Sequence, residues 1–233
     1  MNLINISQRK KIIWATVIAI IFHLVGFVGI LWIDLPGFVA MTPVNLILCF
    51  LLIVWTQDKP DFPFFFFSLV AFTTGIFTEY VGVNKQLIFG HYQYENALGL
   101  KMGGVPWIIG INWFMVIYCC GITVHTLLNQ FLNSRNIKSL SQRSTLVFIA
   151  VIFFGALLAM MFDWLMEPVA IRLGYWTWLT DGGIPLKNYW DWFFVSAFLM
   201  IVFRLLDFSK KNQFALHLLL IQVLFFLLLR ILL

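Results

Sequence analysis

Charge is scarce in this sequence. Only 11% of the 233 residues are charged, whereas 62% are hydrophobic and the mean hydropathy is +0.95. A soluble domain carries about 25% charged residues, so the composition excludes an ordinary soluble protein. It indicates an integral membrane protein. The net charge of +5 comes from basic residues in several short loops rather than one basic stripe. We therefore expect no nucleic-acid partner.

Familiar catalytic and metal-binding patterns are also missing. The sequence has no HExxH, P-loop or GxSxG motif, and no set of aspartate-rich motifs for magnesium-diphosphate. Cys49, Cys119 and Cys120 lie inside apolar segments without disulfide-framework or metal-ligand spacing. His91 lies in a motif described below, but its counterpart there is a tyrosine, which argues against metal ligation. We expect neither a metal nor another cofactor.

Long apolar runs fill the chain instead. A span needs about 17 to 25 apolar residues and must satisfy its own backbone hydrogen bonds, so each run predicts a helix. Together they predict an all-α, polytopic membrane protein of about seven transmembrane helices that forms a single integral membrane domain over residues 1–233. The expected spans are about 11–33, 39–55, 63–83, 105–131, 145–171, 187–206 and 214–233.

Lysine and arginine placement predicts the orientation. Ten of the fifteen basic residues fall on one side of this topology, at the N-terminus and in the loops 56–62, 132–144 and 204–213. The other side holds Lys85, Lys101, Arg172, Lys187 and Arg230. The positive-inside rule then predicts a multi-pass protein of the cell (inner) membrane, with the N-terminus in the cytoplasm and the C-terminus outside.

Two stretches rich in glycine and aromatic residues interrupt this pattern, and they align with each other. When Gly90 is aligned with Gly174, a carboxylate stands eleven residues before each glycine, at Glu79 and Asp163. The letters HYQY (91–94) then align with YWTW (175–178), and GGVP (103–106) with GGIP (182–185). Seven residues after each proline stands a tryptophan, Trp113 and Trp192, preceded by Asn112 and Asp191.

Four ordered elements predict an internal duplication. Each unit would be helix, motif loop and helix, at about 63–131 and 145–206. Because the units share one orientation, they form a parallel repeat about an axis along the membrane normal. Each Gly-Gly-hydrophobic-Pro element is typical of a tight turn into a helix, with proline in the first helical turn.

Three carboxylates are the candidate catalytic residues: Glu79, Asp163 and Glu167. The last two are four residues apart and share a helix face. A carboxylate in a bilayer costs several kcal/mol, so such residues usually face a protein interior and carry function. Burial beside another carboxylate favours the protonated form that a general acid needs.

A structural interpretation competes with this one. The carboxylates could instead pair with Arg172, Lys85 or Lys187 near the outer surface and only hold helices together. For Asp191 the two interpretations stand equal.

Aromatic and amide side chains of the motifs are the candidate substrate-binding residues. Their π faces can line a cavity and stabilise a positive charge on a substrate, although an interfacial aromatic belt would also place many of them there. The candidates are Tyr92, Tyr94, Asn112, Trp113, Tyr175, Trp176, Trp178, Asn188, Asp191 and Trp192.

The ordered motifs resemble the membrane-bound carotenoid biosynthesis proteins that include the carotenoid 1,2-hydratases of the bacterioruberin and γ-carotene type. The resemblance covers residues from about 70 to 195 and includes Glu79, the aromatic motifs, the Asp163–Glu167–Pro168 group and both proline turns. The chain also looks distantly like the small membrane lycopene cyclases. The P-x-E-E element of that group is absent, since LKN (186–188) follows the second proline.

The resemblance implies addition of water to the terminal isoprenoid double bond of an acyclic carotenoid end, as in lycopene or γ-carotene. A protonated Asp163 or Glu79 would protonate the alkene, aromatic faces would stabilise the tertiary carbocation, and Glu167 would take a proton from the captured water. Other enzymes of the carotenoid pathway are further candidate partners.

Two other functions stay open. A cyclase would use the same protonation but lose a proton instead of gaining water, in a dry pocket. A transporter or pigment-binding protein could also use a parallel repeat with carboxylates in its spans. Against that class, the polar motifs cluster at one membrane face and no lysine sits mid-span for a retinal Schiff base.

Overall fold

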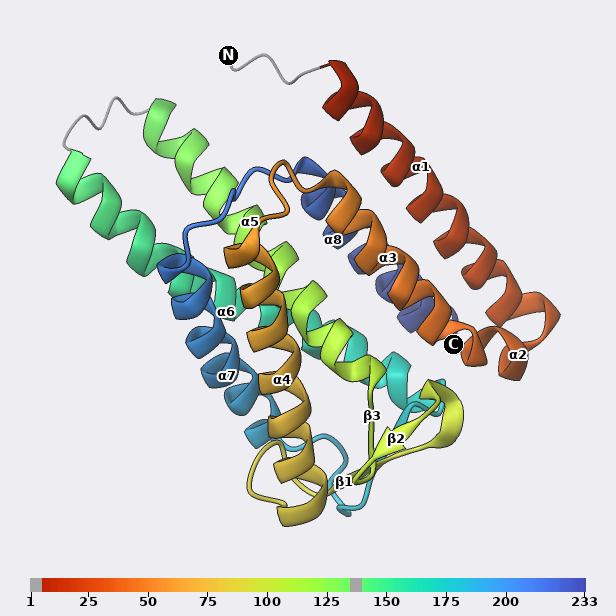
Figure 1. Cartoon of the computed structure of the whole chain (residues 1–233). Coiled ribbons are helices and arrows are strands. Elements are labelled where there is room, and N and C mark those ends of the chain that lie inside the picture. Colours follow the sequence, from red (N-terminus) through yellow and green to blue (C-terminus); the bar gives the residue numbers. More distant parts are fainter. Residues whose placement is uncertain (1–5, 135–139) are drawn as a thin grey trace.

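Long helices form a bundle that carries two small β-sheets at one end, as the computed structural model shows (Figure 1). It describes residues 6–134 and 140–233. In chain order the elements are α1 (Ile6–Val28), a π-helical turn (Gly29–Ile33), α2 (Leu35–Ala40), α3 (Thr42–Thr56), α4 (Phe62–Lys85), β1 (Tyr92–Tyr94), a 3-10 turn (Asn96–Leu98), β2 (Lys101–Met102), β3 (Val105–Pro106), α5 (Ile108–Ser134), α6 (Leu140–Arg172), β4 (Trp176–Trp178), α7 (Leu186–Leu205) and α8 (Gln213–Leu232).

The helices match the expected spans, so the prediction of an all-α polytopic membrane fold is confirmed. Among the described residues, six helical segments are long and apolar enough to cross a membrane: Ile6–Ile33, Leu35–Thr56, Phe62–Lys85, Ile108–Ser134, Thr145–Arg172 and Gln213–Leu232. The seventh expected span forms α7, whose 20 residues would cover about 30 Å. Lys187, Asp191 and Arg204 make α7 less apolar than the others, yet it runs alongside α4 and α6 (Figure 1).

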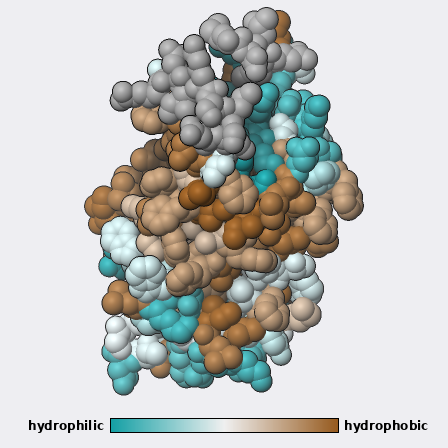
Figure 2. All heavy atoms as spheres, turned by 90° about the vertical axis from the view of Figure 1, so that its left-hand side faces the viewer, coloured by the Kyte–Doolittle hydropathy of each residue, from teal (hydrophilic) through white to brown (hydrophobic). Residues whose placement is uncertain are grey.

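The surface agrees with a bilayer setting. On the face shown in Figure 2, hydrophobic side chains form a broad band across the middle, and hydrophilic ones gather towards the ends. The start of α1 and the end of α8 lie towards opposite ends of the bundle (Figure 1). The side chains of Arg135, Lys138 and Arg143, which support the predicted orientation, lie outside the described residues.

Helix α5 is the centre of the bundle. It contacts α3, α4, α6, α7 and α8, and it is buried around its whole circumference over most of its length. A helix that is apolar on every side belongs in such a position. Gly75 of α4 lets α5 approach closely, because a Cβ there would lie 2.5 Å from the Trp113 ring. This close approach carries Trp113 to within reach of Glu79, one turn further along α4.

Three details differ from the sequence-based expectation. The second span is divided, since α2 ends at Ala40 and α3 begins at Thr42. The fourth begins only at Ile108, because Val105–Pro106 pairs with Lys101–Met102 in a β-hairpin. Pro106 and Pro185 both precede their helices rather than lying in the first turn. Strands therefore occupy part of the loops that the apolar pattern left undefined.

Candidate functional site

The two motif stretches are joined by a strand pair. β1 and β4 are antiparallel, with Tyr92 opposite Trp178, Gln93 opposite Thr177 and Tyr94 opposite Trp176. Side chains alternate along a strand, so the four aromatic rings lie on the inner face while Gln93 and Thr177 are exposed. The aromatic-x-aromatic spacing of HYQY and YWTW thus places four ring donors over the interior of the bundle.

Aligned glycines direct the chain into these strands. Gly174 has φ +69° and ends α6, and the Tyr175 N–H donates to the Ala170 carbonyl at 3.0 Å, a typical glycine helix end. Gly90 has φ +140°, and a Cβ there would lie 2.9 Å from Pro185 and 3.0 Å from the Trp178 ring. Both positions favour glycine, the second also because two motif elements meet there.

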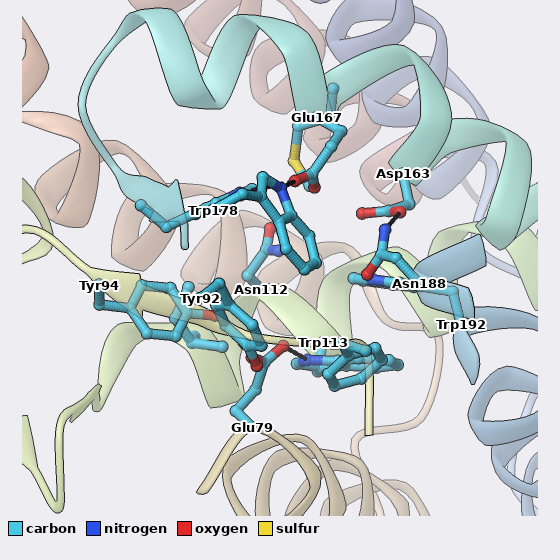
Figure 3. Close-up of a pocket in the computed structure, with 14 residues that line it drawn as sticks. Glu79, Tyr92, Tyr94, Asn112, Trp113, Asp163, Glu167, Trp178, Asn188 and Trp192 are labelled. Carbon is cyan, nitrogen blue, oxygen red and sulfur yellow. Dashed lines mark hydrogen bonds between the residues drawn. The ribbon is translucent and has the colours of Figure 1, made fainter. Parts of the chain in front are cut away.

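Glu79 accepts three hydrogen bonds. Its Oε2 accepts from the Tyr92 hydroxyl at 2.5 Å and the Tyr94 hydroxyl at 2.8 Å, and its Oε1 accepts from Trp113 Nε1 at 3.0 Å. The donors come from β1 and α5, while Glu79 lies on α4 (Figure 3). This carboxylate therefore ties the first motif loop to two helices.

The second unit divides its acidic groups between two positions on α6. Glu167 Oε1 accepts from Trp176 Nε1 at 2.8 Å and from Trp178 Nε1 at 2.5 Å. Asp163 Oδ2 accepts from Asn188 Nδ2 at 2.9 Å, whereas its buried Oδ1 has no hydrogen-bond partner among the described residues. Asp163 thus presents a free oxygen to the interior.

Pro168 changes the helix backbone beside these carboxylates. A proline has no N–H, so the carbonyl four residues earlier, on Trp164, loses its helical partner. Arg230 of α8 donates from Nη1 to that carbonyl at 3.0 Å, and its guanidinium lies 4.2 Å from the centroid of the Trp164 ring. In a membrane such freed carbonyls need a new partner, and Arg230 supplies it.

All three carboxylates face one small cavity of about 30 Å³ (Figure 3). Their exposed fractions are 4% for Glu79, 1% for Asp163 and 2% for Glu167. The remaining wall consists of Phe89, Tyr92, Tyr94, Ile109, Asn112, Trp113, Met166, Trp176, Trp178, Asn188 and Trp192. A cavity of this size holds about two water molecules, since one needs about 10–15 Å³.

A second cavity of about 240 Å³ lies on the other side of a shared wall. Both cavities are lined by Ile109, Asn112, Met166 and Trp176. Tyr175, a candidate substrate-binding residue, lines only the larger one, where its hydroxyl and the Thr42 hydroxyl lie 2.6 Å apart.

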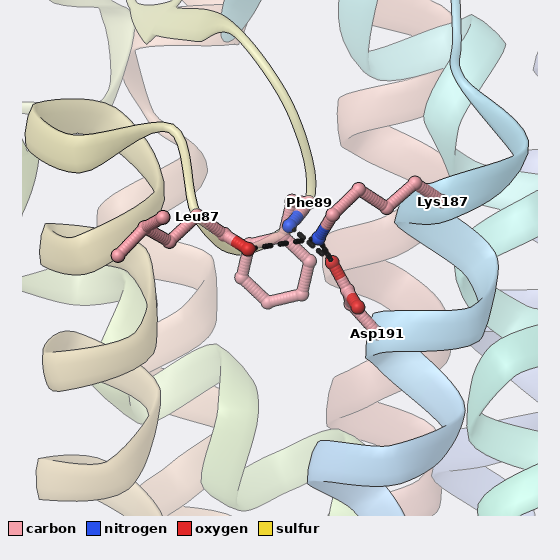
Figure 4. Close-up of polar contacts among 4 residues, drawn as sticks. All are labelled: Leu87, Phe89, Lys187 and Asp191. Carbon is pink, nitrogen blue, oxygen red and sulfur yellow. Dashed lines mark hydrogen bonds and ion pairs between the residues drawn. The ribbon is translucent and has the colours of Figure 1, made fainter.

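Asp191 lies outside both cavity walls. It forms an ion pair with Lys187, accepts a hydrogen bond from the Phe89 N–H at 2.6 Å, and Lys187 donates to the Leu87 carbonyl at 2.9 Å (Figure 4). The pair therefore attaches α7 to the loop between α4 and β1. Of the interpretations open for Asp191, these contacts match the structural one.

The other carboxylates have no such cation. Among the side chains that the structure describes, at 6–134 and 145–233, the Lys187–Asp191 pair is the only ion pair, so Lys85 and Arg172 do not neutralise Glu79, Asp163 or Glu167. The same part of the chain contains no cluster of three His, Cys, Asp or Glu side chains able to hold a metal ion. Neutral hydroxyl, indole and amide donors surround the acidic groups instead.

The tyrosine donors keep their protons. Burial, followed by the charge of Glu79, raises the pKa of Tyr92 and of Tyr94 well above the ordinary value. Both hydroxyls therefore donate to Glu79 throughout the neutral pH range.

Sequence reasoning missed several wall residues. Ile109 lies on α5 about one turn before Trp113, and Met166 lies between Asp163 and Glu167, so helical spacing could have identified both. Phe89 has φ +65° and enters the wall because its N–H is held by Asp191 on α7. Nothing in the sequence near Phe89 predicts this contact, because Asp191 lies 102 residues further along the chain.

These features define a polytopic membrane protein with a buried acidic site at one end of its helix bundle. The sequence model of the family described as "Carotenoid biosynthesis protein" matches residues 38–233, and the chain belongs to that family. No curated protein and no solved structure matches the chain.

Proposed function

We propose that the protein is a carotenoid hydratase, which adds water to the terminal isoprenoid double bond of an acyclic carotenoid end group. The unpartnered, buried Oδ1 of Asp163 carries the proposal. A proton on this oxygen has no protein acceptor, so it is available for an alkene carbon in the cavity. Membership of the family supports the substrate class.

Asp163 is a better proton donor than Glu79 because of their different hydrogen bonds. Three donors already occupy the oxygens of Glu79, so a proton there would compete with them. Protonation of the less substituted alkene carbon by Asp163 leaves a tertiary carbocation. The aromatic faces and the Glu79 carboxylate stabilise this positive charge.

Water capture completes the reaction. A water attacks the cation through its oxygen, and Glu167, whose Oε1 is held by two indoles, takes the released proton on its other oxygen. Return of this proton to Asp163, one turn away on α6, restores the site. The net change is alkene plus water to tertiary alcohol, with no change of oxidation state.

Room for water favours hydration over cyclisation. The 30 Å³ cavity between the carboxylates has room for about two water molecules beside the acidic groups. A cyclase needs a dry site, where the cation loses a proton instead.

The internal duplication is part of the proposal. Trp113 stacks on its aligned counterpart Trp192 with ring centroids 3.9 Å apart, and Gln93 pairs with its counterpart Thr177. Contacts between equivalent residues are those expected on a two-fold axis between duplicated units. We further propose that this end of the bundle faces the outer side of the cell membrane and that the N-terminus lies in the cytoplasm.

Pigment analysis tests the function. The protein is produced in a host that makes lycopene and γ-carotene, and its pigments are compared by chromatography and mass spectrometry with those of a host carrying Asp163→Asn. A more polar pigment heavier by one water, absent with the variant, is expected. An isomer of unchanged mass would indicate cyclisation, and unchanged pigments would argue against both reactions.

A further inference from the structure

We propose that the 240 Å³ cavity binds the isoprenoid chain of the substrate and opens to the bilayer between α1 and α3. The inference rests on the proposed function for the reacting end of the molecule. It adds the site that holds the adjoining chain and the route by which an apolar substrate reaches the carboxylates.

Continuity with the acidic cavity is the first argument. Asn112 and Ile109 of α5, Met166 of α6 and Trp176 of β4 line both cavities. A chain in the larger cavity therefore needs to pass only these side chains for its terminal double bond to reach Asp163. The acidic cavity, at about 30 Å³, has no room for the adjoining isoprenoid chain.

Exposure of the outer wall is the second argument. Four residues that line the cavity also lie on the protein surface: Phe22 (46% exposed), Val25 (54%), Met41 (56%) and Val44 (54%). Phe22 and Val25 belong to one segment able to span a membrane and Met41 and Val44 to the next, so we expect these exposed side chains to face lipid tails. An acyclic isoprenoid hydrocarbon partitions into the same phase and would enter here without crossing water.

The inner wall is mainly aromatic and apolar, as an isoprenoid chain requires. Phe38, Phe225 and Phe226 supply aromatic surface. Gln222, 5% exposed, also lines the cavity, and its Oε1 has no hydrogen-bond partner in the described part of the chain.

Phe38 is held at the wall by close packing. A Cβ at Gly29, the first residue of the π-helical turn, would lie 2.2 Å from the Phe38 ring. π-Helical turns often accompany functional sites. Glycine at position 29 therefore lets the Phe38 ring pack against this turn while it lines the cavity.

Photolabelling tests the site without requiring turnover. The protein and its Asp163→Asn variant are reconstituted in liposomes, irradiated with a diazirine-bearing squalene analogue, and mapped by peptide mass spectrometry. Labels are expected on α1, α3 and α8 wall residues in both proteins, with competition by unlabelled squalene. Labels spread evenly over lipid-facing residues, without competition, would overturn the proposal.

Two cavity variants have matched controls. Gly26→Leu fills the wall, and a Cβ at Gly26 meets only the Phe225 ring at 4.0 Å, so the fold has room for it. Val44→Trp narrows the opening, while Ile47→Trp, on the same helix and 44% exposed but outside the wall, is its control.

The cavity variants should reduce competable labelling about tenfold, as expected for lost apolar burial of a little over 1 kcal/mol. Ile47→Trp should leave it unchanged. Equal labelling in all variants would overturn the proposal. If competable labelling is found but the pigment assay shows no new product, the proposed binding site is supported and the proposed hydratase activity is rejected.

Discussion

The two motif units use similar aromatic strands but arrange their acids differently. In the first, three donors converge on one carboxylate, Glu79. In the second, two indoles hold Glu167, while Asp163, the aligned counterpart of Glu79, keeps a free oxygen. Under the proposed function, the first unit would hold a carboxylate in place and the second would transfer the proton.

The hydrogen-bond donors of the two motif units also differ. The first strand offers tyrosine hydroxyls and the second offers indole N–H groups, which only donate. The indole acceptor of the second unit, Glu167, lies one turn beyond Asp163 on α6, so the aligned position keeps the free oxygen on which the proposed proton transfer depends. Four experiments follow from this asymmetry, in order of expected effect.

The largest effect is expected for Asp163→Asn. If Asp163 is the general acid, product formation should fall about 10²- to 10⁴-fold. The amide keeps the size of the side chain, so photolabelling of the larger cavity should persist. Initial rates in liposomes measure the loss, and a near-normal rate would assign the proton to another group.

The next comparison sets Glu79→Gln against Glu167→Gln. Glu79 ties α4, α5 and β1 together, so its variant should lower both the unfolding temperature and the rate. Loss of hydrogen bonds to a charged group costs about 1.5–3 kcal/mol each. Glu167→Gln should lower the rate with a smaller loss of stability. Thermal unfolding in detergent measures the stability loss of each variant, and initial rates measure its loss of activity. A larger stability loss in Glu167→Gln than in Glu79→Gln would contradict the assigned roles.

A smaller effect concerns pH. The pKa of Tyr92 is raised above 10.0 in the folded protein, mainly by burial and then by Glu79. The folded state therefore holds this proton more tightly than the unfolded chain, and its stability contribution is intact below pH 10 and lost as the pH rises beyond it. Tyr92→Phe should weaken the decline of unfolding temperature above that pH. An identical decline in wild type and variant would exclude this linkage.

The smallest effect is expected for Arg230→Met. It removes the donor to the Trp164 carbonyl that Pro168 leaves free, which should cost about 1 kcal/mol and reduce the rate a few-fold through displaced α6 carboxylates. The double variant with Pro168→Ala restores the helical N–H and should recover most of the loss. Failure of this rescue would show that Arg230 acts in some other way.

Much of the fold could be predicted because bilayer-spanning helices are local objects. Apolar runs located α1 and α3 to α8, and alignment of Gly90 with Gly174 selected residues that meet around one cavity. The Trp113–Glu79 contact was not predictable, because it depends on how closely Gly75 lets α4 approach α5. The larger cavity could not be predicted from the sequence either. Its wall combines residues that lie far apart in the chain, from Phe22 to Phe226.

The helices and the recurring residue types can be deduced from the amino-acid order, because backbone hydrogen bonding in lipid and strand alternation involve only residues a few positions apart. Which carboxylate has all its oxygens hydrogen-bonded and which keeps a free oxygen becomes clear only in the packed bundle. That distinction depends on donors from distant segments: Tyr92 and Tyr94 reach Glu79, whereas Asn188 reaches only one oxygen of Asp163. Hydrogen bonds between segments require the packed bundle, since their short range admits no partner until the helices are in contact.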